Sequence, residues 1–99
     1  MSFRHVVALQ WKPDTTPEQR QTIVTALHAL PSLIPTIRSY VIGEDAGINA
    51  GNHDLVIVAD FDDADGYVIY RDHPEHQRVI HDHIAPHVAA RAAVQHDVT

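Results

Sequence analysis

Histidines crowd one short segment of the chain. The stretch YRDHPEHQRVIHDH, from Tyr70 to His83, holds four of the nine histidines in 99 residues. Imidazole supports three kinds of chemistry near neutral pH: it binds metal ions, it transfers protons as a general acid or base, and it hydrogen-bonds buried polar groups. The spacing of these side chains, and the elements that carry them, help to distinguish the three.

The spacing of the histidines does not favour a transition-metal site. A zinc ion needs three or four ligand atoms at about 2 Å. His76 and His83 would lie roughly 10 Å apart along a helix, so one ion cannot bind both. Pro86 interrupts the i, i+4 pair of His83 and His87, and the chain has no cysteine. We predict no metal site, although the scattered aspartates leave a hard cation such as magnesium open. No phosphate loop or dinucleotide fingerprint occurs, so we also predict no cofactor.

Hydrophobic patterning predicts four strands. They span residues 3–11, 37–43, 53–61 and 87–98. In the first strand, alternation places His5 on the same face as Val7 and Leu9, whereas Val6 and Ala8 lie on the other face. Because both faces carry apolar side chains, we expect both to be covered.

Three helices are predicted between the strands, each with a start signal. Thr16 and Gln19 form a capping box for the first helix, which Pro31 is expected to end. The other two helices follow the third strand. Their expected limits are Asp62 or Asp63 to Arg71, and a second capping box at Asp72 and Glu75 to Pro86.

Helical phase divides the histidines of the last helix. At 100° per residue, His76 and His83 fall on the side of Val79, which should face the sheet, while His81 points to solvent. If the same sheet face carries His5, then His5 and His76 approach each other between the sheet and the helices.

The order of the elements, βαββαβ, is that of the ferredoxin-like α+β fold, a four-stranded antiparallel sheet with helices on one face. We expect residues 1–99 to form a single domain. The helix-free face would expose Val6, Ala8 and part of an apolar third strand, which is a liability for a monomer. We therefore predict a homodimer in which two sheets pack face to face, a dimeric α/β barrel.

Charge and hydropathy argue against several kinds of partner. The formal net charge of -6 argues against nucleic acid and against anionic membrane surfaces. The opening MSFRHVVALQW lacks the long apolar core of a signal peptide, and no run approaches the ~20 apolar residues of a membrane span. We expect a cytoplasmic protein with no nucleic-acid partner and no membrane partner.

Several segments resemble one known family. RHVVALQWK, LIPTIRSYVIGED, HDLVIVADF and especially YRDHPEHQRV resemble the stress-responsive A/B barrel (Dabb) domain over essentially the whole chain. The resemblance implies a homodimer of ferredoxin-like subunits but no single function. Members include plant stress proteins, uncharacterised bacterial proteins, and a plant polyketide cyclase that closes a linear tetraketide by aldol condensation. The functional residues of that cyclase correspond to His5, Tyr70 and His76 here.

These three residues are the candidate catalytic groups. An aldol reaction needs a base that removes a proton beside a carbonyl, and a donor that stabilises the enolate oxygen. The resemblance implies His76 as the base, the Tyr70 hydroxyl as the donor, and His5 as a group that orients or polarises a second carbonyl. His83 and His73 are candidate ligand-binding residues.

Three functions remain open at this point. The first is a protein of unassigned activity that handles a small molecule in a cavity between sheet and helices. The second is an acid–base enzyme of the polyketide-cyclase type. The third is a non-catalytic stress or assembly protein, in which His5 and His76 hydrogen-bond each other or the backbone and fill the interior.

Overall fold

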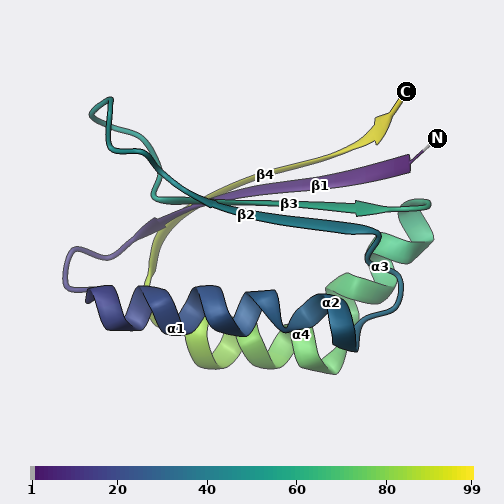
Figure 1. Cartoon of the computed structure of the whole chain (residues 1–99), viewed down its shortest axis with the longest axis horizontal. Coiled ribbons are helices and arrows are strands. Elements are labelled where there is room, and N and C mark those ends of the chain that lie inside the picture. Colours follow the sequence, from purple (N-terminus) through teal and green to yellow (C-terminus); the bar gives the residue numbers. More distant parts are fainter. Residues whose placement is uncertain (1) are drawn as a thin grey trace.

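The computed structural model describes residues 2–99. They form a four-stranded antiparallel sheet with helices against one face (Figure 1). The strands are β1 (Ser2–Trp11), β2 (Ser39–Glu44), β3 (Leu55–Phe61) and β4 (Val88–Val98). Their order across the sheet is β2-β3-β1-β4. This arrangement confirms the predicted ferredoxin-like fold.

The helical layer is more broken than predicted. It consists of α1 (Pro17–His28), α2 (Leu30–Leu33), α3 (Ala64–Asp72), α4 (Pro74–Val79) and a π-helix, η1 (Ile80–Ile84). The capping box of α1 is confirmed, because the backbone N–H of Gln19 donates to Thr16 Oγ1 and that of Thr16 donates to Gln19 Oε1. The predicted end of this helix is wrong: α1 ends at His28, and Pro31 lies in the first turn of α2. In a first turn the missing N–H of proline costs no helical hydrogen bond.

The predicted capping box at Asp72 is also wrong. Asp63, one of the two predicted positions, does cap α3. However, α3 continues through Asp72, so Asp72 cannot cap the next helix, and its carboxylate pairs with Arg71 instead. The chain leaves helical geometry one residue later, at His73 (φ -63°, ψ 134°), because a residue before proline avoids the α region. The His73 Nδ1 atom accepts the backbone N–H of Glu75 at 3.1 Å and so caps α4.

The core lies between the sheet and the helices. On β1 the side chains of Val7, Leu9 and Trp11 are buried on the helix-facing side, as the alternation predicted. His5 belongs to the same row and is also buried, with 5% of its surface exposed. A polar ring in an apolar layer needs hydrogen-bond partners, and those partners define the site described below.

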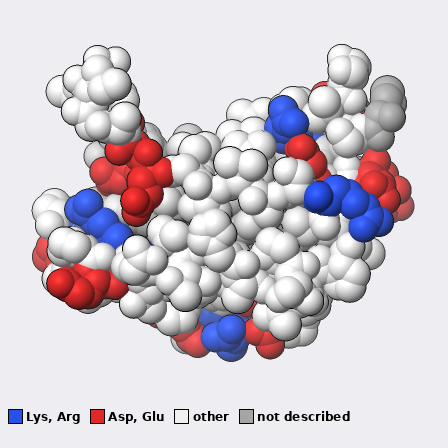
Figure 2. Space-filling view, in the orientation of Figure 1, with Lys and Arg blue, Asp and Glu red and all other residues white. Residues whose placement is uncertain are grey.

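In the described part of the chain, no helix covers the opposite face of the sheet (Figure 1). One row across this face consists of four valines that the strand register places side by side: Val94, Val6, Val58 and Val41. The two outer valines are open to solvent, with Val41 55% and Val94 60% exposed. Figure 2, in the same orientation, shows a hollow above this face between the β2–β3 loop and the end of β4. This valine row is the surface that the predicted dimer would cover.

Candidate active site

A cavity of about 360 Å³ lies between the sheet and the helices. Its volume falls in the lower part of the range of ligand pockets, roughly 300–1,000 Å³. Apolar side chains from β1, β3, β4, α1 and η1 form most of its wall. The polar and charged residues that line it are His5, Tyr67, Tyr70, Arg71, His76, Gln77 and Arg91. Apolar walls with a few polar groups are typical of a small-molecule site.

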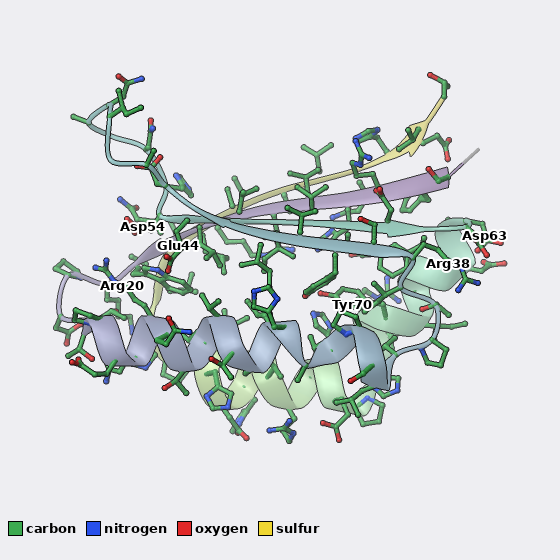
Figure 3. All side chains as sticks on the ribbon, in the orientation of Figure 1. Arg20, Arg38, Glu44, Asp54, Asp63 and Tyr70 are labelled. Carbon is green, nitrogen blue, oxygen red and sulfur yellow. The ribbon has the colours of Figure 1, made fainter. Side chains whose placement is uncertain are left out.

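Three elements bring the candidate catalytic residues to this cavity. His5 comes from β1, Tyr70 from α3 and His76 from α4. The ring of Tyr70 lies 4.1 Å from that of His76 and 6.1 Å from that of His5, measured between centroids. Figure 3 shows Tyr70 in the layer between the sheet and the helices. Tyr67, one turn earlier on α3, packs 4.9 Å from His5.

The hydrogen bond of His5 determines where its proton lies. The side-chain amide nitrogen of Gln95, opposite His5 on β4, lies 2.8 Å from His5 Nδ1. An amide nitrogen only donates, so Nδ1 accepts and the ring proton is on Nε2. Burial lowers the pKa of His5 to about 4, with smaller contributions from the positive charge of Arg91 and from His76 whenever that ring is also protonated. At pH 7 His5 is therefore neutral, and its Nε2–H is a donor.

His76 has the opposite tautomer. Its Nδ1 atom lies 3.0 Å from the backbone carbonyl oxygen of Arg71. A carbonyl oxygen only accepts, so Nδ1 carries the proton and Nε2 carries the lone pair. Burial is the largest influence on the pKa of His76 and lowers it below its usual value, although the Arg71 carbonyl acts in the other direction. Neutral His76 is thus a proton acceptor at Nε2, whereas His5 is a donor.

The hydroxyl of Tyr70 has a partner that the sequence did not suggest. Tyr70 Oη lies 2.9 Å from Tyr40 Oη, and burial raises the pKa of both groups, that of Tyr40 to about 12. Both hydroxyls are therefore protonated near neutral pH. When Tyr40 donates to the oxygen of Tyr70, the proton of Tyr70 is free to be donated to a ligand.

Tyr40 and Gln95 were missed because their roles depend on strand register. Both lie in one row of the sheet with His5, which pairs with Gln95 on one side and connects to Tyr40 through Ala59 on the other. Alternation along one strand predicts which face a residue occupies, but not its neighbour on the next strand. Tyr67 was detectable, because its i, i+3 spacing to Tyr70 places both rings on one helix face.

The structure does not bring His83 into this cavity. In η1 the backbone N–H of Ala85 donates to the carbonyl of Ile80, an i→i+5 bond of 2.7 Å. The wider turn rotates fewer degrees per residue than an α-helix, so it turns His83 away from the cavity, whereas Ile84 still lines it as its helical phase predicted. His83 instead lines a separate hollow against α1, together with His87. His73 does not line the cavity either, because its ring caps α4.

Metal ligands do not gather at either hollow. Within residues 2–99, no group of three or more His, Asp or Glu side chains is placed to hold one metal ion. The two imidazoles of the main cavity are both neutral and are held by protein partners, Gln95 for His5 and the Arg71 carbonyl for His76. Such an arrangement suits proton transfer.

A family profile and a curated relative both match this chain, and both point to the same family. The sequence profile described as the Stress responsive A/B Barrel Domain matches residues 3–98. A protein of Arabidopsis thaliana, described as stress-response A/B barrel domain-containing, is 32% identical over 81 residues, which are 75% of this chain and 67% of the relative.

Solved structures with the same fold include proteins with and without a named activity. A dimeric ferredoxin-like protein of unknown function from Thermobifida fusca YX is 42% identical, with a TM-score of 0.91 over 99% of this chain and 92% of that one. A hydroxynitrile lyase from Passiflora edulis has a TM-score of 0.88 over 99% of this chain and 94% of that one. Its identity is 15%, so this likeness extends to the fold alone.

Proposed function

The chain belongs to the stress-responsive A/B barrel (Dabb) family, and from that premise we propose that it is a homodimer that binds a small carbonyl compound and transfers a proton at the carbon beside the carbonyl. One observation carries this proposal. Two neutral imidazoles of opposite tautomer line a single cavity, so that His76 offers a lone pair and His5 offers a proton.

The proposed reaction uses both imidazoles. His76 Nε2 takes a proton from the carbon next to the carbonyl, and the electron pair of the broken C–H bond forms the carbon–carbon double bond of an enolate. The carbonyl π pair moves to oxygen, which accepts a hydrogen bond from His5 Nε2–H or from the Tyr70 hydroxyl. The enolate carbon then either recovers the proton from the His76 imidazolium or attacks a second carbonyl carbon, in which case the π pair of that carbonyl moves to its oxygen and this oxygen takes the proton from the imidazolium. The apolar part of the wall lowers the local dielectric constant and so strengthens these hydrogen bonds.

A narrower candidate is an intramolecular aldol reaction of the polyketide-cyclase type. Such a reaction needs donors for two carbonyl oxygens of one substrate. Two residues that line the cavity could supply them: His5 through its Nε2–H, and Tyr70 through its hydroxyl when Tyr40 donates to the oxygen of Tyr70. This pair of donors favours a dicarbonyl substrate over a simple ketone.

Hydrogen–deuterium exchange tests the proposal without knowledge of the natural substrate. Proton NMR in deuterium oxide follows the loss of α-proton signals from a panel of small ketones, aldehydes and β-diketones. We expect the wild-type protein to accelerate the exchange of at least one compound, with a rate that saturates as the compound is increased. His81→Ala should retain the full rate, because His81 lies outside the cavity and its side chain is 89% exposed. A panel in which no compound exchanges faster than in buffer would refute the proposal.

The homodimer is proposed to form through the valine row on the helix-free face of the sheet. The solved structure at 42% identity is described as dimeric, and the row is apolar and open. Val94→Asp places a carboxylate in this row. Because burying an unpaired carboxylate on association is unfavourable, sedimentation at micromolar concentration should show this variant as a monomer. Val68→Asp on α3, where Val68 is 38% exposed, is the matched control and should leave the mass unchanged. Equal masses for the two variants would place the interface elsewhere.

We also propose that the protein acts in the cytoplasm without nucleic-acid or membrane partners. The support is compositional: 7 Lys and Arg residues against 13 Asp and Glu residues leave no excess of positive charge. In the part of the chain that the structure covers, no helix has the length and hydropathy that a bilayer crossing requires.

A further inference from the structure

The main cavity has a charge pattern opposite to that of the whole chain. The formal net charge of the protein is -6. Nevertheless, among residues 2–99 those that line the cavity include two arginines, Arg71 and Arg91, and no aspartate or glutamate. An anionic ligand in this cavity would meet positive charge and no carboxylate.

The two arginines differ in their partners. Arg71 donates two hydrogen bonds to the carboxylate of Asp72, at 2.9 and 3.0 Å, so its charge is already compensated. Arg91 takes part in none of the ion pairs formed among residues 2–99. One guanidinium group at the wall of the cavity, that of the exposed residue Arg91, therefore has no carboxylate partner in the described chain.

Strand register explains why Arg91 reaches the cavity. On β4 it pairs with Leu9 of β1, and Leu9 faces the helices. The guanidinium thus lies on the same side of the sheet as His5. The positive charge of Arg91 is near enough to help lower the pKa of His5, second only to the effect of burial.

We propose that Arg91 makes this cavity a site for a ligand that carries a carboxylate, which pairs with the guanidinium while the apolar part of the ligand lies against Leu9, Ile57 and Val88. Guanidinium and carboxylate match as a two-bond pair. One unpaired cation matches a monoanion, and this favours a carboxylate over a doubly charged phosphate. This inference rests on the proposed function and narrows its substrate class to small apolar oxo acids. The carboxylate of such an acid would pair with Arg91, and its carbonyl group would lie beside His5 and His76.

Matched acids and amides test this inference. Benzoate with benzamide, and hexanoate with hexanamide, differ in charge but little in shape, and NMR titration gives the affinity of each. We expect wild-type protein to bind each acid about tenfold more tightly than its amide, as a charge-assisted hydrogen-bonded pair allows. Arg91→Gln should remove this preference by weakening the binding of the acids about tenfold more than the binding of the amides. Arg91→Lys should restore part of it, because lysine keeps the charge but loses the two-bond geometry.

Arg20→Gln is the control for the loss of one positive charge. Arg20 lies on α1, at the end of the molecule away from Tyr70 in Figure 3, and does not line the cavity. This variant should keep the preference for acids. Equal binding of acids and amides by the wild type would overturn the inference, and so would a preference that survives in Arg91→Gln.

The outcomes separate this inference from the proposed function. If neutral β-diketones exchange their α-protons with wild-type protein but acids show no preference, only the inference about Arg91 fails. If no acid or amide binds and no compound exchanges, the proposed function fails and the inference fails with it.

Discussion

Replacing His76 with alanine is expected to slow protein-catalysed exchange of α-protons by about 10²–10⁴-fold, the usual contribution of a general base. The reason is the hydrogen bond from His76 Nδ1 to the Arg71 carbonyl, which leaves the Nε2 lone pair as the proton acceptor of this ring. His5 cannot substitute for it, because the proton of His5 is on Nε2 and its Nδ1 lone pair is engaged by Gln95. Proton NMR in deuterium oxide measures the rates.

Two further measurements separate a chemical role of His76 from a packing role. His76→Gln keeps a donor for the Arg71 carbonyl but has no basic nitrogen, so its rate should be as low as that of His76→Ala. Free imidazole should restore part of the rate to the alanine variant, because it can occupy the space left beside Tyr70 and supply a base. If both variants kept the wild-type rate and lost only thermal stability, His76 would be a structural residue and the proposed chemistry would be wrong.

The free energy of unfolding is expected to fall by ~3 kcal/mol between about pH 6.5 and pH 4 on account of His5 alone. The pKa of this imidazole drops from 6.5 to about 4 in the folded protein, chiefly because the ring is buried. As the pH falls through 6.5, His5 becomes protonated in the unfolded chain. In the folded chain it stays neutral until about pH 4. The stabilisation is therefore complete above pH 6.5 and is lost as the pH falls through the pKa of the folded state.

Urea unfolding at a series of pH values measures this effect. His5→Gln removes the titrating group and keeps a polar side chain beside Gln95. Other groups, such as Asp60 in its ion pair with Arg4, titrate in both proteins and cancel in the difference. Between about pH 6.5 and pH 4, the free energy of unfolding of the wild type should fall by ~3 kcal/mol more than that of His5→Gln. Parallel curves for the two proteins would mean that His5 is not a neutral buried imidazole.

Local signals in the sequence were sufficient for most of the fold. The capping box at Thr16, the alternation of β1 and the start of α3 at Asp63 all depend on residues within one or two turns of one another, and the structure agrees with each. The errors arose where an adjacent feature changed the backbone. Pro74 moved the cap of α4 to His73, and a π-turn after Ile80 turned His83 away from the cavity.

The site was only partly predictable for a different reason. His5, Tyr70 and His76 were named through family resemblance, and helical phase supported the position of His76. Gln95 and Tyr40, which control the proton of His5 and the hydroxyl of Tyr70, enter through pairings across the sheet. A pairing between residues so far apart in the chain depends on strand register, which alternation within a strand does not specify.

The opposite tautomers of two neutral imidazoles are the central claim, and nitrogen NMR of the histidine rings at pH 7 tests it most directly. We expect His5 to carry its proton on Nε2 and His76 to carry its proton on Nδ1, with neither ring charged. The same tautomer in both rings, or a positive charge on either of them at pH 7, would contradict the claim and remove the basis for the proposed chemistry.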